Sequence, residues 1–258
     1  MNEKNARPRV GIALGGGAVR GLAHIGVLAE LEDAGIPIDV VAGTSVGAVV
    51  GALYAAGMST AEMEYIAGKI RWRDLARPVW PRRGLLTFEP LERTFIRLLG
   101  DITFADLARP FATVCTDMRT GRQVVIDRGR VAAAVRASAS VPVAVEPLEY
   151  EPYLLADGVL VNNTPASVVR ALGADYVIGV DILAPDFMRG GGLLGIGIMA
   201  LEIAFANSGG CHAESDCYIA PRLGGLTYVL FSEMETFIRH GREAAAEALP
   251  GIRRALRL

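Results

Sequence analysis

The sequence predicts an α/β protein built on a mainly parallel sheet, and three observations carry this prediction. Short apolar runs alternate with segments of helical periodicity, glycines stand at many of the junctions, and 52% of the 258 residues are hydrophobic. Strands that alternate with helices usually pair in parallel, and the connecting helices cover the faces of the sheet. A mean hydropathy of +0.35 indicates a well-buried core rather than a disordered chain.

Two strand–helix units open the chain, and a further helix follows them. The expected elements are a strand at 9–14, a helix at 22–35, a strand at 38–43 and helices at 45–56 and 59–70. Apolar residues at helical spacing support the first helix, and Gly35 ends it. The last helix begins with a capping box, Ser59-x-x-Glu62, whose side chains satisfy free N–H groups of the first turn.

Residues 69–100 differ in composition from their surroundings. They contain both tryptophans of the chain, three prolines and many arginines. We expect a loop-rich excursion followed by a short helix at about 90–99. Two interpretations stay open for this segment: a solvated surface connection, or a basic, aromatic cap that meets an anionic or lipid interface.

The second half of the chain returns to strands and helices. The expected elements are a strand pair at 111–117 and 123–127, a helix at 130–138, a strand at 153–156, a helix that starts at 162–165 and ends at 173–175, a strand at 176–181, a helix at about 193–207, a short strand at 218–220 and a C-terminal helix. In the helix that starts at 162–165, Pro165 is expected at the first helical position. A second capping box, Ser232-x-x-Glu235, is expected to open the last helix. No linker or repeat divides the chain, so we expect one domain over 1–258, with 9–167 carrying the motifs and 168–258 completing it.

Composition narrows the classes of function. A net charge of −2 gives no reason to expect nucleic acid as a partner. Three irregularly spaced cysteines suit neither a disulfide framework nor a zinc site, which fits a reducing compartment. Residues 1–9 are polar and charged and lack the apolar region of a signal peptide, so a cytoplasmic location is expected. The uncharged stretch from Val40 to Met58 contains turn residues near its start and is not expected to span a membrane.

The first chemical motif is Gly43-Thr44-Ser45-Val46-Gly47, which has the form G-x-S-x-G. A serine on such a strand-to-helix turn is lifted above the sheet in a strained backbone conformation. The small residues Gly43 and Gly47 allow strand and helix to approach each other. Ser45 is therefore the candidate nucleophile.

A nucleophilic serine also needs an oxyanion hole, and Gly15-Gly16-Gly17-Ala18 is the candidate. Glycine-rich backbone between a strand and a helix exposes N–H groups, and the helix dipole adds positive potential. The same features could cradle a phosphate. However, the dinucleotide pattern G-x-G-x-x-G fits imperfectly, and no Gly-Lys-Ser/Thr follows as a P-loop requires.

The general base is the third requirement. His24, His212 and His240 are the histidines of the chain, and His24 comes too early for the usual order of serine, acid and histidine. Asp157 is the best-placed carboxylate, because it ends a predicted strand and precedes Gly158. A shielded carboxylate within reach of a serine hydroxyl can act as its base.

Three blocks of the sequence together resemble a known family. Gly16-Gly17-Ala18-Val19-Arg20-Gly21, Gly43-Thr44-Ser45-Val46-Gly47 and Asp157-Gly158 are similar, in order and spacing, to the motifs of the patatin-like phospholipase family. The resemblance covers nearly the whole chain and is strongest to small bacterial members.

The resemblance implies a three-layer α/β/α fold and a Ser45–Asp157 dyad without metal or cofactor. It assigns the oxyanion hole to the N–H groups of Gly16, Gly17 and Ala18, with Arg20 and Gly21 supporting the loop. Two residues depart from the family pattern. Ala18 stands where many members have glycine, and Val159 follows Gly158 where Gly or Ala is usual.

The function expected from these parts is the hydrolysis of acyl esters of lipids, of the phospholipase A or lysophospholipase type. Alternatives are a small-ester carboxylesterase or thioesterase, and a catalytically quiet lipid-binding regulatory protein. Residues 69–100 are the expected site of peripheral contact with the inner face of the membrane. The sequence does not indicate an oligomeric state.

Overall fold

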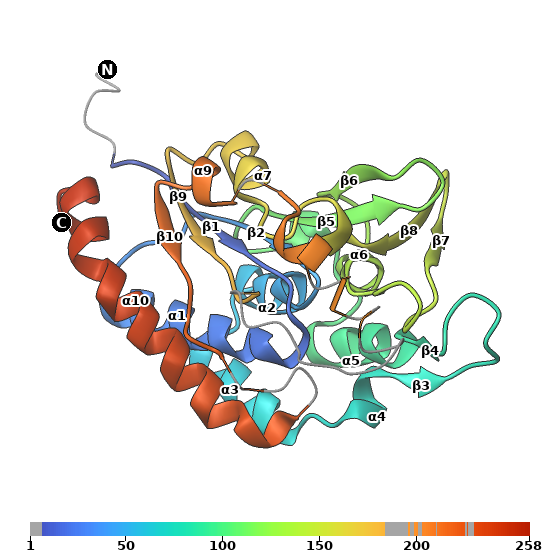
Figure 1. Ribbon diagram of the computed structural model, residues 1–258. Helices are drawn as coiled ribbons and strands as arrows, with labels where there is room; N and C mark the ends of the chain where they lie inside the picture. The colour runs from blue at the N-terminus through green and yellow to red at the C-terminus, as the bar shows by residue number, and fades with distance from the viewer. Residues whose placement is uncertain are drawn as a thin grey trace.

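A sheet runs through the middle of the molecule and carries helices on both faces (Figure 1). The computed structural model describes residues 7–183, 196, 199–200, 203–209, 211–224, 226 and 230–258. The strands are β1 (Val10–Leu14), β2 (Val40–Thr44), β3 (Arg77–Pro78), β4 (Leu86–Thr87), β5 (Phe111–Asp117), β6 (Arg122–Ile126), β7 (Leu148–Tyr150), β8 (Tyr153–Asp157), β9 (Tyr176–Val180) and β10 (Cys217–Ile219). The α-helices are α1 (Leu22–Asp33), α2 (Val46–Ala55), α3 (Thr60–Lys69), α4 (Trp72–Leu75), α5 (Glu89–Leu99), α6 (Val131–Ser138), α7 (Ala166–Ala171), α9 (Cys211–Glu214) and α10 (Met234–Leu256).

The main sheet has the order β10-β9-β1-β2-β5-β8-β7, and β6 pairs with β5 as well. The pairs from β10 to β5 are parallel, whereas β5–β8, β8–β7 and β5–β6 are antiparallel. The prediction of a mainly parallel sheet is therefore confirmed. The central strands β1 and β2 are buried along their whole length, because helices cover both of their faces.

Two apolar cores lie on opposite faces of this sheet, which confirms the three-layer arrangement. One core joins small residues of the strands, such as Ala13 and Ala42, to Val169 of α7. The larger core joins Ile12 and Leu14 to the helices of the other face. There α1 and α2 cover the sheet, and α10 packs along α1 (Figure 1).

The strand β5 explains how distant parts of the chain meet. Its residues Thr113 and Val114 pair with β2 on one edge and with β6 on the other. Cys115 pairs with Asp157 at the end of β8, and also with β6. It follows that β2 and β8 share one edge of β5 and approach each other from opposite directions. Thr44 and Asp157, opposite the consecutive residues Val114 and Cys115, therefore come close together.

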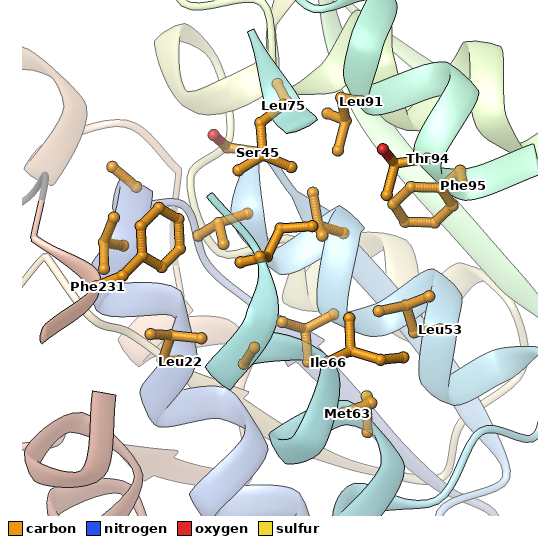
Figure 2. A pocket seen from close by; sticks show the side chains of 18 of the residues that line it. Leu22, Ser45, Leu53, Met63, Ile66, Leu75, Leu91, Thr94, Phe95 and Phe231 are labelled. Carbon is orange, nitrogen blue, oxygen red and sulfur yellow. The ribbon is translucent and has the colours of Figure 1, made fainter. Parts of the chain in front are cut away.

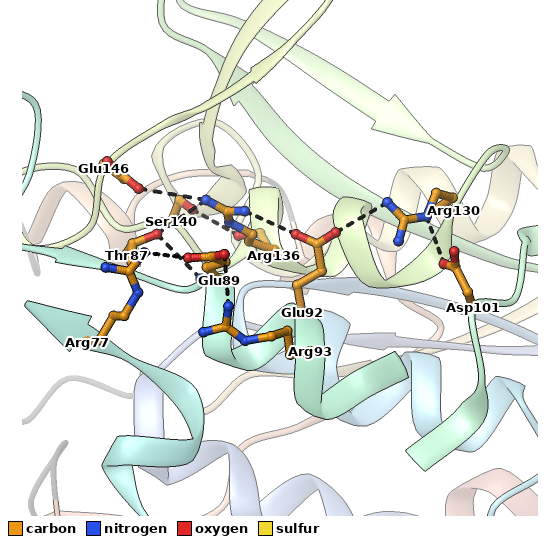
Figure 3. Close-up of polar contacts among 10 residues, drawn as sticks. All are labelled: Arg77, Thr87, Glu89, Glu92, Arg93, Asp101, Arg130, Arg136, Ser140 and Glu146. Carbon is orange, nitrogen blue, oxygen red and sulfur yellow. Dashed lines mark hydrogen bonds and ion pairs between the residues drawn. The ribbon is translucent and has the colours of Figure 1, made fainter. Parts of the chain in front are cut away.

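Residues 69–100 form the short helix α4, the two-stranded pair β3–β4 and the helix α5. Ion pairs tie this segment to α6, and a further ion pair ties α6 to the loop that follows it (Figure 3). Arg136 of α6 bonds to Glu92 of α5 at 3.0 Å and to Glu146 at 3.7 Å, and Arg130 bonds to Glu92 at 3.4 Å. Glu89 pairs with both Arg77 and Arg93, so part of the positive charge expected here is neutralised within the segment.

Several local expectations differ from the structure. The capping box predicted at Ser232 is wrong, because Ser232 lies in a 3₁₀ turn (Phe231–Glu233) and α10 begins at Met234 without a side-chain cap. Pro165 is the N-cap of α7 rather than its first helical residue. The strand β7 was not predicted. Part of the helix expected at 193–207 lies outside the described residues, and the described residues 196, 199–200 and 203–206 are helical. The capping box at Ser59 is confirmed.

Candidate functional site

Ser45 occupies the sharp turn between β2 and α2. Its backbone has φ 56° and ψ −126°, a conformation that non-glycine residues seldom adopt. Its N–H donates to Ser138 Oγ at 3.0 Å, and Ser138 Oγ donates to the Val114 carbonyl at 2.6 Å. The turn is thus attached to β5 as well as to β2. Only 7% of Ser45 is exposed, and this remainder faces a cavity.

The two glycines of the motif are required by close backbone contact. A Cβ on Gly47 would lie 2.0 Å from the Leu14 carbonyl oxygen, and one on Gly43 would lie 2.3 Å from the Gly47 carbonyl oxygen. Any side chain at either position would push α2 away from β1 and β2. The first turn of α2 therefore holds Ser45 directly beside the glycine loop that follows β1.

The glycine loop borders Ser45 from the other side. A Cβ on Gly16 would lie 3.0 Å from the Ser45 Cβ. Gly17 has φ 155°, and Ala18 has φ 51° in the left-handed region. Within the described residues, the N–H groups of Gly17 and Ala18 have no hydrogen-bond acceptor. They are the donors that remain available to a bound oxyanion.

Gly16 requires a correction. Its N–H donates to Asn163 Oδ1 at 3.0 Å and so does not serve as a free donor for an oxyanion. Its contribution is the lack of a side chain, which allows the loop to pass beside Ser45. Asn163 itself was not predicted as a site residue. The neighbouring run Asn162-Asn163-Thr164-Pro165 stood out in the sequence only as a helix start.

Asp157 ends β8 and is completely buried. Burial raises the pKa of its carboxyl group to about 7, while the Ser45 side chain and the Val159 N–H act in the opposite direction. The Val159 N–H donates to Oδ1 at 2.9 Å. Oδ2 has no hydrogen-bond partner among the described residues, although the Ser45 hydroxyl lies near enough to this carboxyl group to affect its pKa. Such contacts often tighten only when substrate binds.

Gly158 and Val159 support this aspartate from the following 3₁₀ turn (Gly158–Leu160). A Cβ on Gly158 would lie 2.3 Å from the Val114 carbonyl oxygen, so this position must stay a glycine. The Val159 side chain packs beside Gly16, where an added Cβ would lie 3.5 Å from Val159 Cγ2. Val159 is thus accommodated next to the loop.

The three histidines lie in different surroundings, and none is paired with Ser45 or Asp157 in the described residues. His24 is completely buried in α1, and its Nε2 bonds to the Gly15 carbonyl at 2.8 Å. Burial lowers the pKa of His24 to about 4, so the ring is neutral at pH 7 and Nε2 carries the donated proton. The His212 ring lies tilted against the Tyr218 ring, with 5.0 Å between the ring centroids, and His240 bonds to the Arg222 carbonyl.

Arg20 lies on the 3₁₀ turn (Ala18–Gly21) that continues the glycine loop. It is buried, and its Nη2 donates to the Leu226 carbonyl at 2.9 Å. Gly21 allows Val46 to pack against the same turn, because a Cβ there would lie 2.2 Å from Val46 Cγ2. Both residues join the loop to its neighbours, as a supporting role requires.

An apolar cavity of about 200 Å³ opens beside Ser45 (Figure 2). Its described walls come from helices α1 to α5, from the turn after the glycine loop, from the segment after α6 and from Phe231, and they contain no charged side chain. Thr94 adds a hydroxyl, but this hydroxyl already donates to the Asp74 carbonyl at 2.8 Å. Figure 2 shows Leu53 and Met63 at the end of the cavity away from Ser45. The sequence did not reveal the cavity, because its walls come from segments that only the fold brings together.

The described residues form neither a metal-binding cluster nor a helix that could span a membrane. They contain no group of three or more histidine, cysteine, aspartate or glutamate side chains that could hold a metal ion. None of the helices in the described part of the chain is both long and apolar enough to cross a membrane.

The fold and site define the class of protein: an α/β protein with a serine elbow, a glycine-rich loop and a buried aspartate at one end of its sheet. The family profile described as patatin-like phospholipase matches residues 12–170. The chain belongs to this family, as its three sequence blocks indicated.

Similar proteins agree with this assignment. An uncharacterised NTE family protein of Mycobacterium bovis is 35% identical over 181 residues, which cover 69% of this chain and 50% of the relative. Patatin-like phospholipase domain-containing protein 6 of Mus musculus is 35% identical over 187 residues, covering 69% of this chain and 14% of that protein. The chain therefore matches half or less of the length of these curated relatives.

Among solved structures, VipD from Legionella pneumophila has a similar fold. It aligns with a TM-score of 0.66 at 12% identity, over 95% of this chain and 67% of VipD. At this identity the likeness concerns the fold alone.

Proposed function

We propose that this protein is a lipid acyl hydrolase in which Ser45 is the nucleophile and Asp157 is the general base. One observation carries the proposal: Ser45 lies between a buried carboxyl group of raised pKa and an uncharged cavity that suits a hydrocarbon chain. A base with a pKa near the working pH is well matched to proton transfer. Membership of the patatin-like phospholipase family supports the same conclusion.

In the proposed reaction, Ser45 Oγ attacks the ester carbonyl carbon while its proton passes to Asp157. The N–H groups of Gly17 and Ala18 stabilise the oxyanion of the tetrahedral intermediate. The intermediate collapses, the C–O bond to the alcohol breaks, and the alcohol takes the proton from Asp157. Water then attacks the acyl-enzyme and gives its proton to Asp157. The fatty acid leaves as Ser45 recovers a proton.

The cavity indicates the class of substrate. Burying a methylene group is worth about 0.8 kcal/mol, so walls made of leucine, isoleucine, phenylalanine and valine favour a long acyl chain. No charged side chain lines the described walls to receive a head group. We therefore propose substrates of the phospholipase A or lysophospholipase type, with the chain inside and the head group outside.

A fluorophosphonate probe tests the chemistry. The wild-type protein should be labelled, and Ser45→Ala should not, whereas the exposed Ser59→Ala should be labelled normally. If the wild-type protein were not labelled, the alternative of a catalytically quiet lipid-binding protein would be favoured. A panel of phospholipids, lysophospholipids, thioesters and short nitrophenyl esters separates the lipid hydrolase from a small-ester carboxylesterase or thioesterase, which would prefer the short substrates.

We also propose that the protein touches the inner face of the membrane through part of 69–100. Trp80 and Leu85 are 81% and 57% exposed, and Val143, on a neighbouring loop, is 73% exposed. Hydrogen bonds of 3.2 and 2.9 Å from the Leu85 and Leu86 N–H groups to the Ala144 carbonyl hold the two segments together. Trp72 instead packs edge-on against Phe231 in the cavity wall.

The chemistry of this surface suits a bilayer. Exposed apolar side chains gain free energy in the membrane interface, and tryptophan beside arginine, as in Trp80 and Arg82, is common there. Val143 also has φ 73°, a backbone conformation that is strained for a β-branched residue. The surrounding fold therefore holds the backbone of this exposed residue in a conformation that valine disfavours.

Co-sedimentation with anionic vesicles tests the membrane contact. Trp80→Ala and Val143→Ser should reduce binding and vesicle-lipid hydrolysis while hydrolysis of a soluble short ester stays unchanged. Tyr65→Ser, an exposed aromatic residue on α3, is the control and should bind as wild type. If Trp80→Ala and Val143→Ser both bound vesicles as wild type does, the proposed membrane contact would be wrong.

A single catalytic domain over 1–258 in the cytoplasm is part of the same proposal. The C-terminal elements support the single domain, since β10 pairs with β9 in the main sheet and α10 packs against α1.

A further inference from the structure

The peptide group between Gly15 and Gly16 is held at both of its polar atoms. Its carbonyl oxygen, on Gly15, accepts from His24 Nε2 at 2.8 Å, and its N–H, on Gly16, donates to Asn163 Oδ1 at 3.0 Å. We infer that His24 and Asn163 are positioning residues that clamp this peptide and thereby aim the next two N–H groups, of Gly17 and Ala18, at the oxyanion. The inference rests on the proposed function.

The clamp is built from three separate parts of the fold. His24 comes from α1, and Asn163 comes from the segment between β8 and α7. A third contact, from the Gly15 N–H to the Val180 carbonyl at 3.0 Å, attaches the start of the loop to β9. The plane of the Gly15–Gly16 peptide is therefore fixed from independent directions before substrate arrives.

Such a clamp matters because the loop cannot fix itself. Gly15, Gly16 and Gly17 have no side chains that could pack, and glycine adopts many backbone conformations at little cost. Rotating one peptide plane in this loop would turn the following N–H groups away from Ser45. Oxyanion stabilisation depends on donors that are oriented in advance.

Both clamping side chains are suited to the task. Burial keeps His24 neutral, with a pKa of about 4, so Nε2 donates a single proton to the Gly15 carbonyl without bringing a charge to the loop. Asn163 is 3% exposed and is oriented in turn by Asp181, whose Oδ1 lies 3.5 Å from Asn163 Nδ2. Asp181 also accepts from the Leu183 N–H at 2.9 Å and the Tyr218 hydroxyl at 3.0 Å.

The test compares variants that remove or retain each bond. His24→Leu and Asn163→Leu should lower kcat roughly 10- to 100-fold, somewhat less than the loss of an oxyanion donor itself, with little change in KM. His24→Gln keeps a donor at similar reach, and Asn163→Asp keeps the acceptor, so each should retain more activity than its leucine counterpart. His240→Leu, on α10 and bonded to the Arg222 carbonyl rather than to the loop, should behave as wild type.

Further readouts separate positioning from general damage to the fold. Affinity for a trifluoromethyl ketone analogue, which forms an oxyanion on Ser45, should fall by the same factor as kcat, whereas affinity for the fatty acid product should not change. The double variant should lose little more than either single variant, because either one releases the same peptide. In the wild-type protein, the Gly16 amide should exchange with deuterium more slowly than the Gly17 and Ala18 amides. This last measurement does not depend on any variant folding.

The outcomes distinguish this inference from the proposed function. An inactive wild-type protein would overturn the proposed function. An active wild type, an inactive Ser45→Ala and fully active His24→Leu and Asn163→Leu would overturn the clamp alone. Equal losses of kcat and of product affinity would indicate a structural role and overturn it too, as would rapid exchange of the Gly16 amide.

Discussion

The site joins two regions that are held together in different ways. The first is the sheet-end centre, formed by Gly15–Ala18, Ser45 and Asp157. Hydrogen bonds with Ser138, Val159, His24 and Asn163 fix its atoms. The second is the apolar cavity, whose helices are held by packing and, at α5, by the ion pairs around Arg136. Hydrogen bonds are directional and set angles, whereas apolar packing sets only volume and shape. The first region therefore suits chemistry, and the second suits selection of the chain.

The largest effect should come from removing the proposed base, Asp157, from the sheet-end centre. Asp157→Asn should lower kcat by about 10²- to 10⁴-fold, the usual contribution of general base catalysis, while the acyl chain still binds. Steady-state hydrolysis of a nitrophenyl ester and fatty acid binding measure the two regions separately. Asp106→Asn, at an exposed capping position, is the control. Full activity of Asp157→Asn would reopen the search for the base among the histidines.

The pH dependence of the same residue should be the next largest effect. Because the pKa of Asp157 is about 7 and the base must be ionised, kcat/KM should rise about tenfold per pH unit below pH 7 and level off above it. A plateau that extends unchanged down to pH 5 would contradict this assignment.

The free energy of unfolding should decrease as the pH rises, whereas kcat/KM increases. The folded protein holds the Asp157 proton more tightly than the unfolded chain, whose carboxyl group titrates near 3.8. This contribution to stability is complete below about pH 4 and is lost as the pH rises through about 7. Asp157→Asn should therefore raise Tm relative to wild type at pH 8 more than at pH 4. Thermal unfolding at both pH values measures the difference, and an equal change at both would argue against a raised pKa.

A smaller effect is expected at the far end of the cavity. Met63 is buried there, and Met63→Trp should shorten the space available to an acyl chain. Each methylene kept out of the cavity should lower kcat/KM about fourfold, from about 0.8 kcal/mol per methylene, with short esters unaffected. A series of nitrophenyl esters of increasing chain length measures this. Met118→Trp, at an exposed position, is the control. A uniform loss over all chain lengths would mean that the change disturbs the chemistry instead.

The smallest effect should be at Ala18. Its φ of 51° costs an alanine about 1 kcal/mol in the folded state, and a glycine would avoid this cost. A glycine also makes the unfolded chain more flexible, which stabilises the unfolded state and offsets part of that gain. Ala18→Gly should thus change the free energy of unfolding by less than about 1 kcal/mol and kcat by less than about threefold. Chemical denaturation and ester hydrolysis check both. A tenfold gain in kcat would show that the alanine impairs the oxyanion hole.

The local sequence was sufficient to predict most elements and the principal candidate residues. Gly43 and Gly47 mark a turn with no room for side chains, and Ser59 and Glu62 cap α3 as their spacing predicts. These features are local, because a turn or a cap depends on residues only a few positions apart. Ser232 shows the limit: the same spacing forms no cap there, because the chain around it turns differently.

The sequence by itself determined the serine elbow, the glycine loop and the buried strands, since each depends on neighbouring residues and their backbone preferences. Only the tertiary structure decided that β2 and β8 meet along one edge of β5, which brings Ser45 to Asp157. It also decided that Asn163, not a substrate, takes the Gly16 N–H, and that helices from separate segments enclose a cavity. These features depend on contacts between residues far apart in the chain, which strand pairing and side-chain packing bring together.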